Sequence, residues 1–260
     1  MRIARFTTGE DPRYAVVQTD EGSGVDVLAV ITGDPIYTAI QFTGEVVALA
    51  DARLLAPVIP RSKVLGIGRN YAAHAAELGN EVPVEPLVFL KPNTSVIGPG
   101  DPVVIPPQSA DVHYEGELAV VIGRLCRDVP RERVAEVVLG YTCANDVTAR
   151  DLQGPDKQWW RAKGFDTFCP LGPYLVTGLD PADLRVTTRL DGATVQDGRT
   201  SSMIFDVASL VVHLSSAMTL LPGDVILTGT PEGVGRMRAG QRVEVEVEGI
   251  GVLSNPVVQR

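Results

Sequence analysis

The sequence predicts an α+β protein dominated by β structure, built as a twisted roll of mostly antiparallel or mixed strands. Short apolar runs bounded by Gly, Pro, Asp and Thr recur along the 260 residues, a pattern typical of strands separated by turns. Only three segments have the length and pattern of helices. The strands are too irregularly spaced, and the helices too few, for an eightfold barrel of alternating strands and helices.

The first sixty residues form a separate unit in this prediction. Strand-like runs at 14–19 and 25–31 are joined by Gly, Asp and Thr turns, and a Pro-bounded stretch at 56–60 follows them. We therefore expect a small β-rich N-terminal domain over residues 1–60 and a main domain over residues 61–260.

The main domain begins with a predicted strand at 64–68, which leads into a helix-prone run at 70–78 that Gly79 ends. Near the C-terminus the run 242–248 alternates charged residues with valine, so its three valines face a core and its three glutamates face water. Further strands are predicted at 87–90, 103–105, 117–122, 185–190 and 225–227.

Two more helices are predicted in the main domain. One spans 131–139 and is ended by Gly140. The longer one spans 207–221, with Asp206 in a good N-cap position and Pro222 as its stop.

Composition excludes several classes of function. The net charge of −9 repels nucleic-acid phosphates and anionic lipid headgroups, and no basic patch offsets it. No stretch has the roughly 18 apolar residues of a membrane span, and the start of the chain lacks the apolar core of a signal peptide. We therefore expect a cytoplasmic protein with no nucleic-acid or membrane partner. Cys126, Cys143 and Cys169 are far apart, with no C-x-x-C pair, and are expected to be buried apolar side chains.

Three carboxylates are candidate metal ligands. Glu115 and Glu117 occupy alternate positions at the start of an apolar strand, so their side chains point to one face. On a buried face a metal ion would compensate the negative charges of both carboxylates, whereas on an exposed strand end water would solvate them. Asp146 could complete an all-oxygen triad, which suits Mg²⁺ or Mn²⁺ rather than zinc. Asn145 and Asp146 could instead form an Asx turn, and spacing alone favours neither interpretation.

A histidine and a glutamate are candidates for acid–base chemistry. His74 and Glu77 are three residues apart in the predicted helix, so the carboxylate can orient the imidazole as a general base that activates water. The alternative is a surface ion pair worth roughly a few tenths of a kcal/mol.

Two lysines lie in apolar or aromatic surroundings, Lys91 beside Phe89-Leu90 and Lys163 after two tryptophans. Each either extends its ammonium group to solvent or is held for an anion such as a substrate carboxylate. Desolvated near a metal, Lys163 could also have a lowered pKa and act in proton transfer or as a Schiff base. A Thr- and Gly-rich loop at 227–235 offers N–H groups and hydroxyls to an anion, although such loops are more often turns.

The order of these motifs resembles the fumarylacetoacetate hydrolase (FAH) superfamily, in particular its acylpyruvase and 2-hydroxyhepta-2,4-diene-1,7-dioate isomerase-like members. The resemblance covers roughly residues 63–260 and implies the family's mixed β-sandwich roll, usually as a homodimer. The first sixty residues look like a variable N-terminal extension. The motifs are Gly66-Ile67-Gly68-Arg69-Asn70-Tyr71-Ala72-Ala73-His74 with Glu77, Phe89-Leu90-Lys91-Pro92, Tyr114-Glu115-Gly116-Glu117, Asn145-Asp146-Val147-Thr148-Ala149-Arg150-Asp151, Arg161-Ala162-Lys163-Gly164-Phe165-Asp166 and Thr228-Gly229-Thr230-Pro231.

The resemblance also implies a role for each site residue. The carboxylate triad would hold Mg²⁺ or Mn²⁺. His74 and Glu77 would be the dyad that activates water, and Lys163, the third catalytic residue, would handle a proton or developing negative charge. The residues expected to bind the substrate or complete its pocket are Arg69, Tyr71, Lys91, Arg150, Gln153 and Thr230.

These roles imply a metal-dependent hydrolase that acts on a small 2-oxo acid. It would cleave the C–C bond of acylpyruvate-type 2,4-dioxo acids such as fumarylpyruvate or acetylpyruvate, through a metal-stabilised enolate and activated water. Alternatives on the same site are isomerisation or decarboxylation of 2-hydroxymuconate-type diacids, as in 2-hydroxyhepta-2,4-diene-1,7-dioate or 5-carboxymethyl-2-hydroxymuconate isomerases, and decarboxylation of oxaloacetate. A metal-free lysine aldolase and a catalytically silent diacid-binding protein are two further alternatives.

Overall fold

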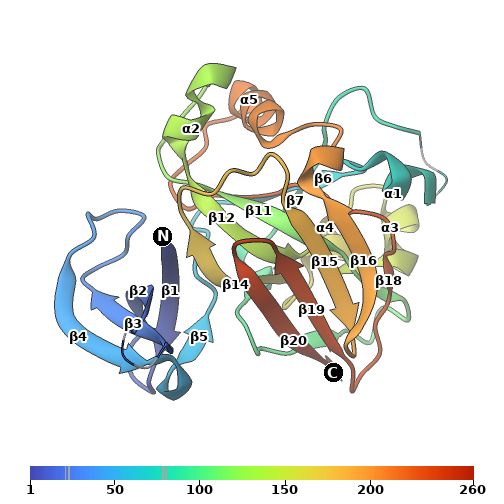
Figure 1. Ribbon diagram of the computed structural model, residues 1–260. Helices are drawn as coiled ribbons and strands as arrows, with labels where there is room; N and C mark the ends of the chain where they lie inside the picture. The colour runs from blue at the N-terminus through green and yellow to red at the C-terminus, as the bar shows by residue number, and fades with distance from the viewer. Residues whose placement is uncertain (21, 23, 78, 80) are drawn as a thin grey trace.

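Strands dominate the protein, as Figure 1 shows. The computed structural model describes residues 1–20, 22, 24–77, 79 and 81–260. These residues form three sheets with short helices at their margins, which confirms the predicted β-rich α+β class. None of the helices in these ranges has the length and apolar composition needed to cross a membrane.

The largest sheet has the strand order β4-β3-β2-β1-β14-β12-β11-β17-β6-β7. Its N-terminal strands are β1 (Arg2–Thr7), β2 (Arg13–Thr19), β3 (Asp26–Ile31) and β4 (Phe42–Ala48), with β5 (Arg53–Leu55) paired to β1. Its remaining strands are β6 (Val64–Gly68), β7 (Leu87–Lys91), β11 (Gly116–Ile122), β12 (Val138–Asn145), β14 (Cys169–Val176) and β17 (Val225–Leu227), with β8 (Val96–Ile97) paired to β14.

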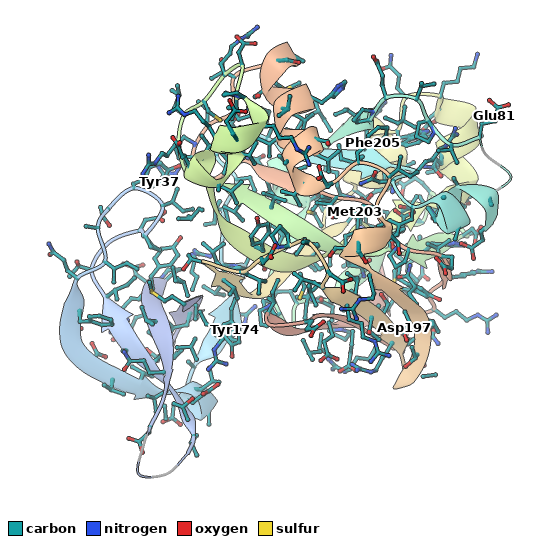
Figure 2. All side chains as sticks on the ribbon, turned by 45° about the horizontal axis from the view of Figure 1, so that its top comes forward. Tyr37, Glu81, Tyr174, Asp197, Met203 and Phe205 are labelled. Atoms are coloured by element: carbon teal, nitrogen blue, oxygen red, sulfur yellow. The ribbon has the colours of Figure 1, made fainter. Side chains whose placement is uncertain are left out.

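The N-terminal strands join the main body through one antiparallel pairing. Ile3 of β1 lies opposite Leu175 of β14, so the large sheet continues across the junction. Arg2 also places its guanidinium carbon 5.7 Å from the centre of the Tyr174 ring, which lies at this junction in Figure 2. Hydrogen bonds of the β1–β14 ladder and packing of side chains thus tie the two parts together.

Two smaller sheets complete the main body. The five-stranded sheet has the order β16-β15-β19-β20-β9 and consists of β9 (Val103–Ile105), β15 (Arg185–Leu190), β16 (Ala193–Arg199), β19 (Arg242–Val247) and β20 (Gly251–Gln259). The three-stranded sheet consists of β10 (Val112–Tyr114), β13 (Thr148–Ala149) and β18 (Gly235–Arg236).

The core lies between the large sheet and the five-stranded sheet. Val245 of β19 and Leu253 of β20 belong to the same buried cluster as Leu118 and Val120 of β11. This face-to-face packing confirms the predicted orientation of the alternating run, because its valines are buried while its glutamates keep contact with solvent.

The longest helix, α5 (Val207–Ala217), begins as predicted, because the Asp206 side chain accepts a hydrogen bond from the Ser209 backbone N–H. It ends four residues before the predicted end at residue 221. Met218 is extended, and Leu220 pairs with Cys126 in a β-bridge, so a tertiary contact ends the helix. Met203 and Phe205, labelled in Figure 2, pack against the main cluster just before α5.

The segment predicted as a helix over 131–139 is helical as far as residue 137 and then changes to a strand. The 3₁₀ turn η3 (Arg131–Arg133) and the short α2 (Val134–Val137) are followed by β12, which starts at Val138 opposite Ile122. Gly140 is a residue of β12 rather than a helix stop. A Cβ there would lie 2.4 Å from the Val176 carbonyl oxygen, so the strand pairing requires glycine. Sheet pairing therefore overrides local helix preference at this point.

The remaining helices are short. α1 (Ala72–Glu77) lies within the predicted 70–78 run, and Gly79 follows with a φ of 66°, as expected of a helix stop. Residue 78 lies outside the described residues. The other helical segments are η1 (Leu49–Asp51), η2 (Asn93–Ser95), α3 (Arg150–Asp156), α4 (Trp160–Gly164) and η4 (Thr200–Ser202). The three cysteines are buried and unpaired with one another, as predicted.

Candidate active site

The hairpin of β11 and β12 brings the three predicted carboxylates together. Glu115 precedes β11, Glu117 is its second residue, and Asp146 directly follows β12. Gly116 lies opposite Asn145 in this antiparallel pair, and the Asp146 N–H donates to the Glu115 carbonyl oxygen at 2.8 Å. All three carboxylates are buried, and one oxygen from each lies within 4.8 Å of the others.

The side chain of Asn145 distinguishes the two interpretations of this segment. Its Oδ1 accepts a hydrogen bond from the Glu115 backbone N–H at 2.9 Å, so it is used to join two strands and not to close a local turn. The Asp146 carboxylate is turned toward two lysines, Lys91 and Lys163. Asn145 and Asp146 therefore do not form an Asx turn, and Asp146 joins the carboxylate cluster instead.

Gly116 explains why a glycine separates the two glutamates. Successive strand residues point to opposite faces, so Gly116 faces the five-stranded sheet while its neighbours face the site. A Cβ at this position would lie 2.0 Å from Thr188 Oγ1 of β15. Only glycine fits at the close approach that holds both glutamates on one side.

Three cations neutralise the cluster. Lys163 Nζ lies 2.7 Å from Glu115 Oε2 and 2.5 Å from Asp146 Oδ2. Arg150 Nη2 lies 2.5 Å from Glu115 Oε1, and Lys91 Nζ lies 2.5 Å from Asp146 Oδ1. The ion pairs bring two of the three carboxylates into contact with cations, and Glu117 has no cation within ion-pair distance among the described residues.

Burial and these charges shift the pKa values of Glu117 and Glu115 in opposite directions. Burial is the largest effect on Glu117 and raises its pKa well above the usual value, and the neighbouring carboxylates of Asp146 and Glu115 raise it further. Burial also opposes ionisation of Glu115, but Lys163 and Arg150 outweigh it and lower the pKa of that carboxyl. The ion-free site thus favours a proton on Glu117.

Lys163 does not have the lowered pKa that its aromatic surroundings suggested. Burial alone would lower it, but the carboxylates of Asp146 and Glu115 outweigh burial and raise the pKa of Lys163. The lysine is therefore held as an ammonium ion, which contradicts the expectation of a neutral amine ready to form a Schiff base. Its Nζ also lies 4.9 Å from the centre of the Phe89 ring.

The predicted dyad forms on α1 at the edge of the same site. His74 Nδ1 lies 3.3 Å from Glu77 Oε2, and the His74 side chain is buried. The backbone N–H of Gly233 donates to both oxygens of Glu77, at 3.1 and 3.2 Å. The loop that contains Gly233 thus fixes the carboxylate that orients the imidazole, which supports the acid–base interpretation over a mobile surface pair.

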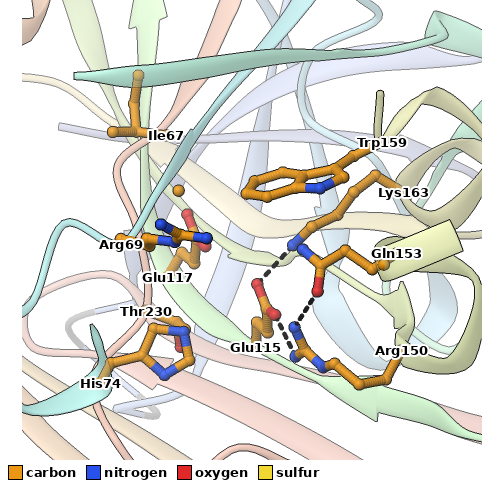
Figure 3. Close-up of a pocket in the computed structure, with 12 residues that line it drawn as sticks. Ile67, Arg69, His74, Glu115, Glu117, Arg150, Gln153, Trp159, Lys163 and Thr230 are labelled. Carbon is orange, nitrogen blue, oxygen red and sulfur yellow. Dashed lines mark hydrogen bonds and ion pairs between the residues drawn. The ribbon is translucent and has the colours of Figure 1, made fainter. Parts of the chain in front are cut away.

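A cavity of about 280 Å³ lies between the triad and the dyad (Figure 3). Trp159 forms one wall, and sequence reasoning did not assign it a site role. Its signal was the adjacent pair Trp159-Trp160, the only tryptophans in the chain, of which Trp160 is exposed. Eight predicted site residues also line the cavity: Arg69, His74, Glu115, Glu117, Arg150, Gln153, Lys163 and Thr230.

Four predicted site residues lie behind this lining. Asp146 is covered by its two lysines, and Glu77 stands behind His74. Lys91 is fully buried behind Asp146, and its contact with substrate stays a prediction. The Tyr71 hydroxyl is buried with no hydrogen-bond partner in the described part of the chain, and burial, followed by the charge of Glu117, raises the pKa of its phenol.

The donor set fits a hard divalent cation. It consists of three carboxylates and no thiolate or imidazole, which suits Mg²⁺ or Mn²⁺. Without an ion, Glu117 lacks a compensating charge, and a cation held by Glu115, Glu117 and Asp146 would supply it. The three carboxylates could therefore hold a metal ion on the floor of the cavity.

Comparisons with known proteins find family models and similar structures that cover this chain. The family model described as Fumarylacetoacetate (FAA) hydrolase C-terminal matches residues 63–258, and the one described as Rv2993c-like, N-terminal matches residues 1–57. The structure of 5-carboxymethyl-2-hydroxymuconate delta-isomerase from Mycobacterium smegmatis is 50% identical, with a TM-score of 0.92 and 100% of both chains covered.

Two further similar proteins have other activities in their names. The fumarylpyruvate hydrolase from Pseudomonas aeruginosa, solved with Mn²⁺ and pyruvate, is 36% identical with a TM-score of 0.74, over 80% of this chain and 92% of that one. The mitochondrial oxaloacetate tautomerase Fahd2a of Rattus norvegicus is 40% identical over 290 residues, covering 99% of this chain and 92% of that protein.

Proposed function

The chain belongs to the fumarylacetoacetate hydrolase family, and from that premise we propose that it is a divalent-metal-dependent hydrolase of acylpyruvate-type 2,4-dioxo acids. One observation carries the proposal. Glu115 and Glu117 of the buried triad, which can hold a cation, line the same small cavity as His74 of the dyad, and Lys163 lines it too.

The triad serves the pyruvate half of the substrate. A divalent ion held there would polarise the 2-oxo group and stabilise the enolate that forms when the bond between C3 and C4 breaks. Lys163, whose Nζ lies within hydrogen-bond distance of Glu115 and Asp146, would stabilise negative charge on the same half.

The dyad serves the acyl half. His74 takes a proton from water, which adds to the C4 carbonyl carbon, while Glu77 holds the ring through Nδ1 and stabilises the imidazolium. The C3–C4 electron pair leaves as the enolate of pyruvate, and protonation at C3 gives pyruvate and the free acid. Gly233 contributes by fixing Glu77 through its backbone N–H.

The test is a substrate panel with matched variants. Purified protein would be assayed on acetylpyruvate, fumarylpyruvate and oxaloacetate with Mg²⁺, with Mn²⁺ and with EDTA, following both pyruvate formation and substrate absorbance. We expect metal-dependent release of pyruvate from an acylpyruvate. The variant His74→Gln should reduce kcat roughly 10²- to 10⁴-fold, as expected for loss of a general base.

His213→Gln is the matched control, because His213 lies on α5 and does not line the cavity. It should keep wild-type kcat. Inactivity of the wild-type protein on all acylpyruvates with either metal would contradict the hydrolase proposal.

The second candidate is keto–enol tautomerisation or isomerisation of a 2-oxo diacid. It is supported by the similarity of the whole chain to an isomerase, at 50% identity, and to a tautomerase, at 40% identity. The same residues would move a proton at C3 without adding water to C4. Metal-dependent change in the absorbance of enol-oxaloacetate, with no pyruvate released, would establish this candidate over hydrolysis.

A further inference from the structure

A single buried amide connects the five-stranded sheet to both halves of the candidate site. Gln196 lies on β16, is 2% exposed and does not line the cavity. Its Oε1 accepts a hydrogen bond from the Gly116 N–H at 2.9 Å, and its Nε2 donates to Thr230 Oγ1 and to the Pro231 carbonyl oxygen, each at 2.8 Å. One side chain thus holds both the glycine between the two glutamates of the triad and the loop that follows β17.

That loop, residues 228–233 and here called the bridging loop, contacts both ends of the site. At one end the Gly229 N–H donates to Glu117 Oε2 of the triad at 2.7 Å. At the other end the Gly233 N–H donates to both oxygens of Glu77 in the dyad, at 3.1 and 3.2 Å. The position of this one loop therefore affects a carboxylate of the triad and the carboxylate of the dyad together.

The bridging loop packs closely against β16, the edge strand of the five-stranded sheet (Figure 1). A Cβ at Gly198 of β16 would lie 2.6 Å from Pro231 Cβ, and one at Gly233 would lie 2.1 Å from the Val195 carbonyl oxygen. Such close contacts keep the loop from moving toward β16, because atoms already fill the space. The hydrogen bonds from the Gln196 amide keep it from moving away.

An amide suits this position because it carries an acceptor and two donors. The acceptor serves the N–H of Gly116 on β11, and the two donors serve the hydroxyl and the carbonyl of the bridging loop. A buried N–H or C=O that loses its partner costs free energy. An apolar side chain of the same length would fill the space but leave the Gly116 N–H and the Pro231 carbonyl unpaired, so the loop would no longer be fixed to the strand.

We propose that Gln196 is a positioning residue that locks the bridging loop to β11, so that Glu117 and Glu77 are held in their working orientations at the same time. This assignment rests on the proposed function, since it takes the triad as the metal site and the dyad as the base that activates water. Gln196 acts through Gly116 and the loop, and not by contact with substrate, because it lies behind the cavity lining. Its loss should therefore weaken metal binding and turnover together.

The test compares two buried amides, each replaced by an apolar side chain of similar size. Asn255 of β20 is the matched control, because it is buried and its amide donates to the carbonyls of Gly98 and Asp101, in a turn that does not line the cavity. Gln196→Met and Asn255→Leu should both lower the urea midpoint of unfolding. In calorimetry only Gln196→Met should weaken Mn²⁺ affinity, by roughly tenfold, whereas Asn255→Leu should stay within about twofold of wild type.

A second variant moves the bridging loop without removing the amide. Gly198→Ala places a methyl group against Pro231, so it should also weaken Mn²⁺ affinity, and it keeps the test decisive if Gln196→Met does not fold. Turnover of acetylpyruvate would be measured at saturating Mn²⁺. We expect both loop variants to keep a kcat roughly tenfold below wild type, because excess metal fills the triad but does not restore the dyad. Asn255→Leu should keep wild-type kcat.

Each outcome has a distinct meaning. Wild-type Mn²⁺ affinity in Gln196→Met, or in Gly198→Ala if the first variant does not fold, would overturn the assignment of Gln196 and leave the proposed function standing. An equal loss of affinity in Asn255→Leu would also overturn it, because general destabilisation would then explain the effect. Failure of the wild-type protein to bind Mn²⁺ would overturn the proposed function and this assignment with it. If the wild-type protein binds Mn²⁺ but leaves acylpyruvates intact, the hydrolase proposal is wrong, and the calorimetric comparison alone decides the role of Gln196.

Discussion

Lys91 Nζ lies 2.5 Å from Asp146 Oδ1, in a position from which solvent is completely excluded. The same ammonium group donates to the Val147 carbonyl oxygen at 3.2 Å. Because Lys163 binds the other oxygen of Asp146, the carboxylate is held between two cations. We infer that Lys91 orients a metal-ligand carboxylate from behind, where the family resemblance implied contact with substrate.

Replacing Lys91 with methionine tests this positioning role. Lys91→Met leaves buried Asp146 with one counter-charge, so we expect the free energy of unfolding to fall by about 3 kcal/mol, as for other broken buried pairs. Affinity for Mn²⁺ should weaken by roughly tenfold, the usual size of an effect through a metal ligand's partner. Urea unfolding and calorimetry would measure the two quantities.

The control is an exposed ion pair. Arg53→Met removes a partner of Asp101 at the surface, where we expect a loss below about 1 kcal/mol and unchanged Mn²⁺ affinity. If Lys91→Met raised KM for a 2-oxo acid while Mn²⁺ affinity stayed at the wild-type value, direct contact with substrate would be the better explanation.

A second prediction concerns the close approach at Gly116. Gly116→Ala places a methyl group 2.0 Å from Thr188 Oγ1, so the strands must separate. We expect a loss of about 1 to 3 kcal/mol in stability, as for other overpacked cores, together with weaker metal binding because Glu115 and Glu117 flank the displaced residue. Urea unfolding and Mn²⁺ calorimetry would detect both effects.

Thr188→Ala should relieve the clash. The Thr188 hydroxyl is buried without a hydrogen-bond partner among the described residues, so its removal alone should cost little, and the double variant should regain part of the lost stability. Gly154→Ala, where a Cβ meets nothing within 4 Å, should be neutral or slightly stabilising. Equal losses in Gly116→Ala and in the double variant would show that Thr188 is not the obstacle.

Each strand that local patterns predicted is present, because a strand's period and its bounding turns can be read from a few residues, but others such as β1, β14 and β20 were not predicted. The strand at 64–68 matches β6, and Asp206 caps α5 as expected. The helix predicted at 131–139 ends two residues early because Val138 pairs with Ile122 of β11, and no local pattern records that pairing.

Likewise, only part of the site could be predicted from local patterns. Alternation placed Glu115 and Glu117 on one face, but spacing alone could not decide whether Asp146 joined them, because that depends on the register of β11 against β12. The raised pKa of Lys163 was likewise beyond local reasoning, since it depends on carboxylates that the fold brings from elsewhere. The family resemblance supplied the triad, and the register supplies its physical reason.

Removing the charge of Glu117 should separate metal binding from stability. Glu117 accepts a hydrogen bond from the Gly229 N–H at 2.7 Å and lies beside two other carboxylates. In EDTA the raised pKa of Glu117 keeps the wild-type side chain neutral, so Glu117→Gln exchanges one neutral group for another and we expect a melting temperature in EDTA close to that of the wild-type protein. Wild-type protein should gain roughly 5 to 10 °C at a hundredfold excess of Mn²⁺ over its Kd, and the variant should gain little.

Glu77→Gln is the matched control for this measurement. Its carboxylate contacts His74 and Gly233 and belongs to the dyad, so the variant should keep the full metal-induced rise in melting temperature. A full rise in Glu117→Gln would contradict the assignment of Glu117 as a ligand.

The ion pair that caps α5 predicts a specific dependence of stability on pH. The hydrogen bond from Arg131 is the largest of the effects that lower the pKa of Asp206 to about 2, below its ordinary 3.8. A carboxyl whose pKa is depressed by folding stabilises the protein above its ordinary pKa and loses that contribution as the pH falls through the folded value. The stabilisation should therefore be complete above about pH 5 and fade between about pH 4 and pH 2.

Two substitutions separate the charge of Asp206 from its capping hydrogen bond. Asp206→Asn keeps an acceptor for the Ser209 N–H and removes the ion pair, so it should be less stable than wild type by roughly 0.5 to 1 kcal/mol at pH 7, since the pair is half exposed. By pH 2.5 most of that difference should be gone. Asp206→Ala also removes the cap and should lose about 1 kcal/mol more. Urea unfolding at pH 7, 4 and 2.5 would measure these differences in the free energy of unfolding. If the difference between wild type and Asp206→Asn stayed constant with pH, the ion pair would not be the origin of that difference.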